Sequence, residues 1–301
     1  MAVRVSCSDA SLEAGEEMIG TAPRVDYWLL VEYGQVWQSD ALGASSIPTS
    51  VKERLTSIAQ NTSNLRVELI KGGGEGEGLS FFVALSDERA PRLFKFSLDS
   101  YSDLLDIDIP HVLSSPDSYS AHAHPSPLFL VCTHGTYDAC CARLGLPLWR
   151  KLKAHGELCV WQATHVGGHR FAPNIVCLPH GIYYGRAFGE EALDLALGFK
   201  EGRLSLENLR GRSCHPREAQ AAEYFLRRET GSTRIDDYAF CGFADEEAEG
   251  RRCALFEDKW GVLYAVTIRV IEGALKTKMN CADEGESLVA RFALEGIERR
   301  S

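Results

Sequence analysis

The sequence has no long hydrophobic run, because no stretch approaches the about 18 consecutive apolar residues that a membrane-spanning helix requires. The opening residues, MAVRVSCSDASLEAGEE, also lack the apolar core of a secretory signal peptide. No run of lysine and arginine is present to neutralise phosphates, and the net charge is −10. We therefore expect a cytoplasmic protein that binds neither membranes nor nucleic acid.

Two motifs of redox enzymes are absent as well. No C-x-x-C pair occurs, so a thiol oxidoreductase of thioredoxin type is the weakest of the redox hypotheses. No flavin or dinucleotide-binding fingerprint is visible either. Any reducing equivalents would therefore come from another protein.

Cysteine, by contrast, is abundant, with ten residues in a chain of 301. A chain of this length with 45% hydrophobic residues can bury a core without disulfide bonds, so we expect reduced thiols. Cys159 and Cys177 lie in strand-like runs and are expected to be core thiols. The scattered cysteines leave open a disulfide or a second site: Cys7, Cys214, Cys241, Cys253 and Cys281.

Hydrophobic patterning predicts a mixed α/β (α+β) fold with a repeated order of elements. Strands are expected at 27–33, 65–70, 79–85 and 92–98, with helices at about 48–61 and 101–105. The same β-α-β-β-β-α order returns with strands at 128–132, 159–163, 174–178 and 182–186, and helices at 146–155 and 190–199. We interpret this as a pseudo-repeat offset by about 100 residues, whose first copy lacks Cys/His groups.

The remaining segments connect or follow these two halves. Residues 114–127 are rich in Ser, Pro, Ala and His, which predicts a linker in which His122 and His124 are solvated rather than metal ligands. Pro147 and Pro216 are each expected in the first turn of a helix. Beyond Gly231 the pattern becomes β, with the longest strand at 260–270, paired with 253–257 and 275–281.

Two residue pairs stand out in the second half. Cys132 ends a predicted strand and Cys141 opens a helix in a C-x8-C pattern, while His165 and His169 form H-x3-H around Gly167-Gly168. The two glycines favour a tight turn at the histidine pair. We expect two thiolates and two imidazoles to converge at one end of a sheet.

Two cofactors suit such a donor set, namely a tetrahedral zinc ion and a [2Fe-2S] cluster with two cysteines on one iron and two histidines on the other. The eight-residue separation is long for a zinc knuckle and favours the cluster. Cys140 is an alternative second ligand to Cys141, although neighbouring side chains point in different directions. His134 and His180 are expected to lie in turns or to contact the ligands, and not to bind the metal themselves.

The charge of the cluster would set its chemistry. With neutral imidazoles an oxidised cluster of this kind carries no net charge, so it accepts an electron more readily than an all-cysteine cluster. Imidazole also allows reduction to be coupled to proton uptake. The segment 125–187 has six basic residues against two acidic ones, and we expect Arg143, Lys151 and Arg170 to favour the reduced state and attract an acidic partner.

Several blocks resemble the sucrase/ferredoxin-like family: LVCTHGTYDACCARLG, THVGGHRFAPNIVCLPHGIYYGR, LRGRSCHPREAQAAEYFL and the N-terminal APRVDYWLLVEYGQVWQSDAL. The resemblance implies a thioredoxin-like ferredoxin domain whose [2Fe-2S] ligands are Cys132, Cys141, His165 and His169. It selects Cys141 over Cys140. A sucrase activity is not supported, since a glycosidase needs two placed carboxylates and the site segment offers only Asp138 and Glu157, which nothing pairs.

These expectations combine into one interpretation. Residues 1–120 form a cluster-free thioredoxin-like domain, 125–230 the ferredoxin domain, and 231–301 a β-rich extension. The function expected is one-electron transfer, with possible coupling to a proton, between a protein reductase and an acceptor. The alternative is a zinc-stabilised Cys2His2 binding module without redox activity.

Overall fold

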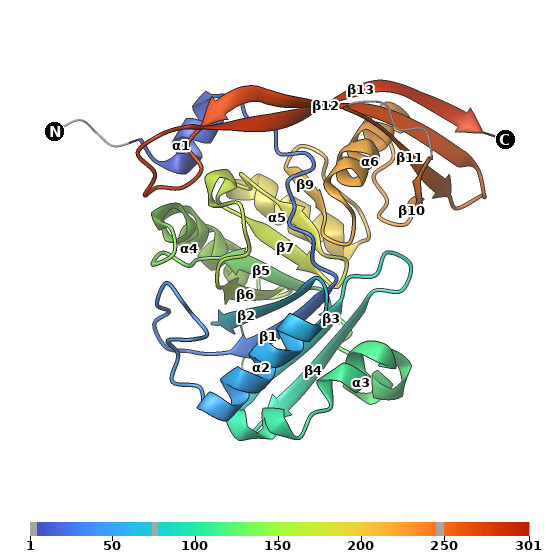
Figure 1. Ribbon diagram of the computed structural model, residues 1–301. Helices are drawn as coiled ribbons and strands as arrows, with labels where there is room; N and C mark the ends of the chain where they lie inside the picture. Colours follow the sequence, from blue (N-terminus) through green and yellow to red (C-terminus); the bar gives the residue numbers. More distant parts are fainter. Residues whose placement is uncertain (1–4, 74–77, 245–249, 301) are drawn as a thin grey trace.

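The computed structural model describes residues 5–73, 78–244 and 250–300 and has a mixed α+β fold, as expected. A large mixed sheet forms the body of the molecule, and a four-stranded antiparallel sheet of C-terminal residues lies along one side of it (Figure 1). Within the described residues, no helix is both long and apolar enough to cross a membrane.

The first half supplies four strands of the large sheet, in the order β4-β3-β1-β2. These are β1 (Tyr27–Glu32), β2 (Leu65–Lys71), β3 (Leu79–Leu85) and β4 (Arg92–Leu98), with α2 (Thr49–Asn61) between β1 and β2. Strand β1 pairs with β2 in parallel and with β3 in the antiparallel direction. The helical elements α1 (Cys7–Glu13), η1 (Tyr101–Leu105), α3 (Ile109–Ser114) and η2 (Pro116–His122) complete this half.

The second half has the same connectivity, in the order β6-β5-β7-β8. Its elements are β5 (Leu128–Cys132), α4 (Ala139–Ala154), β6 (Cys159–Ala163), η3 (His169–Phe171), β7 (Ile175–Leu178) and β8 (Ile182–Tyr184). Strand β5 is parallel to β6 and antiparallel to β7, just as β1 is to β2 and β3. The repeated order of elements is therefore also a repeated pattern of strand pairing.

The two halves share one sheet, because β2 pairs with β6 through Ile70↔Ala163 and Lys71↔Gln162. Their apolar side chains also share one core cluster, which contains Trp28 from the first half and Trp161 from the second. The sheet continues beyond β8 into β9 (Leu209–Arg212). Helix α5 (Gly189–Lys200) packs against α4.

The C-terminal sheet comprises β10 (Tyr238–Phe243), β11 (Arg251–Asp258), β12 (Leu263–Thr277) and β13 (Ser287–Arg300). It packs on α6 (Arg217–Thr230) through a core that includes Phe225, Phe256 and Ile268. The strand expected at 260–270 is β12, which runs from Leu263 to Thr277. The first residues of the separate strand expected at 275–281 are therefore the end of β12. Strand β13 was not expected, because few of its residues are buried.

Two further expectations are corrected. Helix α4 begins at Ala139 instead of Leu146, so Pro147 lies inside the helix and not in its first turn. The reason is the carboxylate of Asp138, which accepts the N–H of Cys140 and caps the helix earlier. Residues 114–127 are not a bare linker either, because His122 stacks on Phe96 with ring centroids 4.4 Å apart.

Candidate metal centre

Two cysteines of the predicted set meet where β5 and α4 touch. Cys132 is the last residue of β5, Cys141 lies in the first turn of α4, and each is 1% exposed. Gly145 permits this close packing, because a Cβ atom there would lie 2.0 Å from the carbonyl oxygen of Cys132. The strand and the helix therefore bring both thiols to one buried point.

The predicted histidines lie in the segment that follows β6. Side chains from other parts of the chain donate hydrogen bonds to the backbone carbonyls of this segment. Arg66 donates to the carbonyl of His165, and Tyr183 donates to that of Val166 at 3.1 Å. Arg210 and Asn174 donate to the carbonyls of Gly167 and Gly168, each at 2.9 Å. Four successive carbonyls thus have a side-chain donor, which fixes the path of the loop.

Gly167 and Gly168 are needed for this path. Their φ angles are +100° and +75°, which disfavour residues with a side chain. A Cβ atom at Gly168 would lie 2.3 Å from a guanidinium nitrogen of Arg210, and one at Gly167 would lie 2.7 Å from Pro23. The expected tight turn is present. Arg210 and Pro23 pack so closely against its two glycines that no side chain fits there.

The structure brings three of the four predicted residues into one group. Donor atoms of Cys132, Cys141 and His165 lie within 4.8 Å of one another, and Nδ1 of His165 is 3.7 Å from the Cys141 sulfur. His169 is adjacent to this group, with its Nδ1 3.4 Å from Nε2 of His165. The ring of Tyr137 stacks on His165 at a centroid distance of 3.9 Å and is 52% exposed.

The tautomer of His169 follows from its partner. Its Nε2 lies 2.6 Å from the carbonyl oxygen of Met279, which can only accept, so Nε2 carries the proton. Burial lowers the pKa of His169, which favours the neutral ring with a lone pair on Nδ1. A metal-bound histidine is typically oriented by such a hydrogen bond from its other ring nitrogen.

The two thiols differ in acidity, because the hydrogen bond to Cys132 and then burial raise the pKa of the Cys141 thiol. A hydrogen bond from Cys141, against the effect of burial and together with His165, holds the pKa of Cys132 well below its usual range. Thiolates are soft donors and imidazoles suit zinc and iron, so this donor set suits zinc or an iron–sulfur cluster. On this chemistry the residues fit either group, and the Cys/His cluster is compatible with metal binding.

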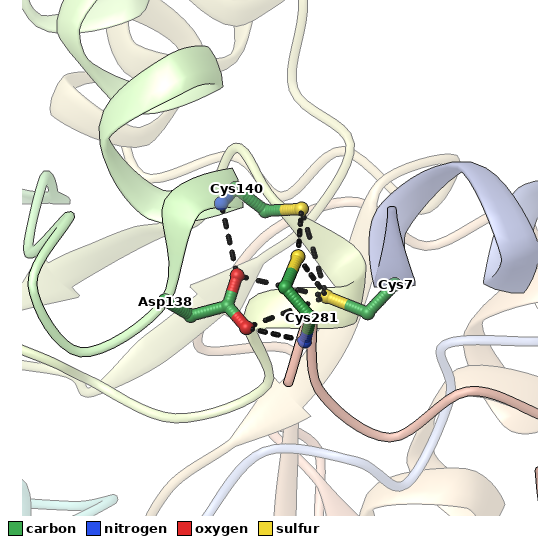
Figure 2. A group of neighbouring side chains, drawn as sticks. All are labelled: Cys7, Asp138, Cys140 and Cys281. Atoms are coloured by element: carbon green, nitrogen blue, oxygen red, sulfur yellow. Dashed lines mark hydrogen bonds between the residues drawn. The ribbon is translucent and has the colours of Figure 1, made fainter. Parts of the chain in front are cut away.

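Cys140 belongs to a different group. Its side chain lies with those of Cys7, Asp138 and Cys281, as Figure 2 shows. In the sequence these residues gave no local signal, because Cys7 and Cys281 are 133 and 141 positions from Cys140. The structure thus places Cys141 with Cys132, and Cys140 in a second cluster.

The expected excess of positive charge at the site is not present. Arg143 pairs with Asp9 at 3.1 Å, and Arg170 pairs with Glu16 at 2.9 Å. Lys151 pairs with Glu190. All three carboxylates come from outside residues 125–187. The net charge of that segment alone therefore overestimates the positive charge near the candidate centre.

The remaining candidates have structural contacts. Nε2 of His134 lies 2.7 Å from the carbonyl oxygen of Gln38, and Cys177 is fully buried, as expected of a core thiol. Cys159 is partly buried against the core cluster that contains Trp28 and Trp161, and burial lowers the pKa of His180 to about 4. Asp138 and Glu157 flank α4 at opposite ends, and the helix between them is about 24 Å long, so they do not form the carboxylate pair of a glycosidase.

Comparison with known proteins gives two matches. The sequence model described as sucrase/ferredoxin-like matches residues 18–211. The "Altered inheritance of mitochondria protein 32" of Meyerozyma guilliermondii is 32% identical over 95 residues, which cover 28% of this chain and 34% of that protein. The chain therefore matches only about a third of the length of this curated relative. No solved structure matches.

Proposed function

The chain belongs to the sucrase/ferredoxin-like family, and from this premise we propose that it is a one-electron carrier with a [2Fe-2S] cluster. The ligands would be Cys132, Cys141, His165 and His169. The observation that carries the proposal is the convergence of two buried thiols with a histidine, next to a second histidine whose outer nitrogen is already bonded to a carbonyl. When bound, such a cluster would take up and release one electron.

The surrounding residues suit that role. Cys132 and Cys141 are buried, whereas His165 and His169 are only partly buried, so the histidine side is nearer to solvent. A cavity of about 420 Å³ borders His165 and Tyr137. We propose that a redox protein partner docks at this side, where electron transfer would cross the shortest distance and where histidine protonation could accompany reduction.

Residues 125–230 would form a thioredoxin-like ferredoxin domain in this proposal, preceded by a cluster-free copy in residues 1–120. Residues 231–301 would be the β-rich extension. The location in this proposal is the cytoplasm, where thiols stay reduced.

A zinc site remains the second candidate, favoured by one specific distance. Cys141 and His165 approach to 3.7 Å, which is close to the about 3.6 Å that separates sulfur and nitrogen ligands of one tetrahedral zinc ion. In that case the protein would be a zinc-stabilised binding module without redox activity.

Composition and colour separate the two candidates. Protein purified without oxygen should be coloured and contain iron and acid-labile sulfide in equal amounts, and Cys132→Ser should abolish both. A control substitution at the exposed Cys241, also to serine, should leave both unchanged. Colourless protein that contains zinc and lacks sulfide would overturn the electron-carrier proposal.

A further inference from the structure

A second cluster of thiols lies beside the candidate centre. The sulfur of Cys140 is 3.2 Å from that of Cys281 and 3.6 Å from that of Cys7, and Cys7 and Cys281 are also 3.6 Å apart. The carboxylate oxygens of Asp138 lie 3.7 and 3.8 Å from the Cys7 sulfur. Figure 2 shows the four side chains directed towards one point.

Three distant segments build this cluster. Cys7 comes from α1, Asp138 and Cys140 from the start of α4, and Cys281 from the segment between β12 and β13. Asp138 aligns two of them, because its oxygens accept the backbone N–H of Cys140 at 2.9 Å and of Cys281 at 2.8 Å. Cys7 and Cys140 are fully buried.

We propose that Cys7, Cys140, Cys281 and Asp138 bind one structural zinc ion, independently of the proposed iron–sulfur centre. Thiolates at about 2.3 Å from a tetrahedral zinc ion lie about 3.8 Å apart, so the observed triangle needs only a small expansion. Asp138 supplies the fourth donor and closes the site, which is typical of structural zinc. Binding displaces the three thiol protons and leaves three thiolates on the metal.

A single disulfide accounts for the geometry less well. It would join two of the three sulfurs at about 2.0 Å and leave the third thiol beside a buried carboxylate. The near-equal spacing of all three sulfurs favours a common central ion instead. Ser8 donates to the Cys140 sulfur at 3.2 Å, and it accepts in turn from the guanidinium of Arg143, which also pairs with Asp9.

The position of the site gives it a structural role. Met279, two residues before Cys281, accepts the hydrogen bond from His169. Zinc would thus anchor the segment that orients His169, and it would tie α1 and the C-terminal hairpin to the start of α4. This contact links the second site to the first without a shared ligand.

The test measures zinc, iron and acid-labile sulfide in the same preparation of the full-length chain. We expect about one zinc ion per chain in the wild type. Cys7→Ser and Cys281→Ser should lose most of the zinc and keep iron and sulfide, whereas Cys132→Ser should do the reverse. The exposed Cys241, changed to serine, is the matched control and should lose neither.

A second measurement covers variants that fail to fold. Co²⁺ added to wild-type protein whose zinc has been removed by a chelator should produce thiolate-to-cobalt absorption, and Zn²⁺ should abolish it. Zinc-loaded wild type should also resist alkylation at Cys7 and Cys281. The proposal is overturned if wild type binds neither metal, if zinc follows Cys132 instead of Cys7, or if the intact mass reveals a disulfide among these cysteines.

Discussion

At the scale of single residues, one backbone carbonyl fixes the tautomer of His169. The carbonyl of Met279 holds the proton of His169 on Nε2 and leaves Nδ1 for a metal. Tyr183 of β8 and Arg210 of β9 donate hydrogen bonds to backbone carbonyls of the histidine loop. The histidines are therefore oriented before any cofactor binds, which reduces the cost of binding.

His169→Cys is predicted to lower the reduction potential towards the about −400 mV of all-cysteine plant-type clusters. A thiolate adds negative charge to the cluster and removes an imidazole that can titrate, so the pH dependence of the potential should weaken. Redox titration at several pH values measures both effects. His122→Cys, far from the site, is the control, and an unchanged pH dependence in His169→Cys would remove His169 from the ligands.

Gly168→Ala is predicted to destabilise the protein by about 1–2 kcal/mol through the left-handed backbone, with more from the contact with Arg210. Gly156→Ala is a matched control, since its φ of +76° equals that of Gly168 within a degree and no atom lies within 4 Å of its added Cβ. Chemical denaturation should give a larger loss for Gly168→Ala. Equal losses would show that Arg210 does not constrain the turn.

The sequence predicts the residues of the first centre better than those of the second. Cys132, Cys141, His165 and His169 are detectable because short spacings and a Gly-Gly turn place them near strand and helix ends. Cys7 and Cys281 have no such spacing to Cys140, and only folding of the whole chain brings them together. The ion pairs of Arg143 with Asp9 and of Arg170 with Glu16 cannot be predicted from the sequence for the same reason.

At the scale of elements, helix α6 and strand β9 are joined by buried charges. Glu223 on α6 contacts Arg212 of β9 at 3.1 Å and His215 at 3.2 Å, and His215 also contacts Glu88 at 3.1 Å. Burial opposes the charge on His215, but the hydrogen bond to Cys214 and those to the two carboxylates raise its pKa well above the usual range. The folded state therefore favours protonated His215.

His215→Gln is predicted to destabilise the protein by about 3 kcal/mol at pH 6, the lower end for removal of one partner of a buried ion pair. Because the folded pKa is raised, the stabilisation is complete below about pH 6.5 and is lost as pH rises through the folded value. The difference between wild type and variant should therefore shrink at alkaline pH. Denaturant unfolding from pH 6 to 9.5 measures it, and a constant difference would contradict the assignment of charge.

Most elements are predictable from local pattern, because buried strands such as β5 read as continuous apolar runs. Strand β13 and the start of helix α4 are exceptions among the long elements. Pro147 resembles a first-turn signal, whereas the cap by Asp138 and the packing of Gly145 on β5 start the helix earlier. Short pieces such as α1 and β9 depend on tertiary contacts and leave little trace in the sequence.

At the scale of the whole molecule, the candidate centre draws on all parts of the chain. Arg66 of β2 donates to the loop of His165, and Met279 near the end of β12 accepts from His169. The pairing of β2 with β6 makes one sheet of the two halves. The centre is therefore supported by residues on both sides of the proposed ferredoxin domain.

A fragment of residues 125–230 is predicted to hold less than half of the iron that the full chain holds. It lacks Arg66 and Met279, and it exposes the edge of β6, which promotes association of unpaired strands. Iron content and size-exclusion chromatography of the two proteins measure this. A monomeric fragment with full iron content would show that the domain is self-sufficient.

The central claim is that two cysteines and two histidines hold a [2Fe-2S] cluster, and electron paramagnetic resonance of the dithionite-reduced full-length protein tests it most directly. Histidine ligation predicts a signal with a low average g value, of the kind given by Rieske centres, that Cys132→Ser abolishes. A reduced protein without a signal, or with the higher average g value of an all-cysteine cluster, would contradict the claim.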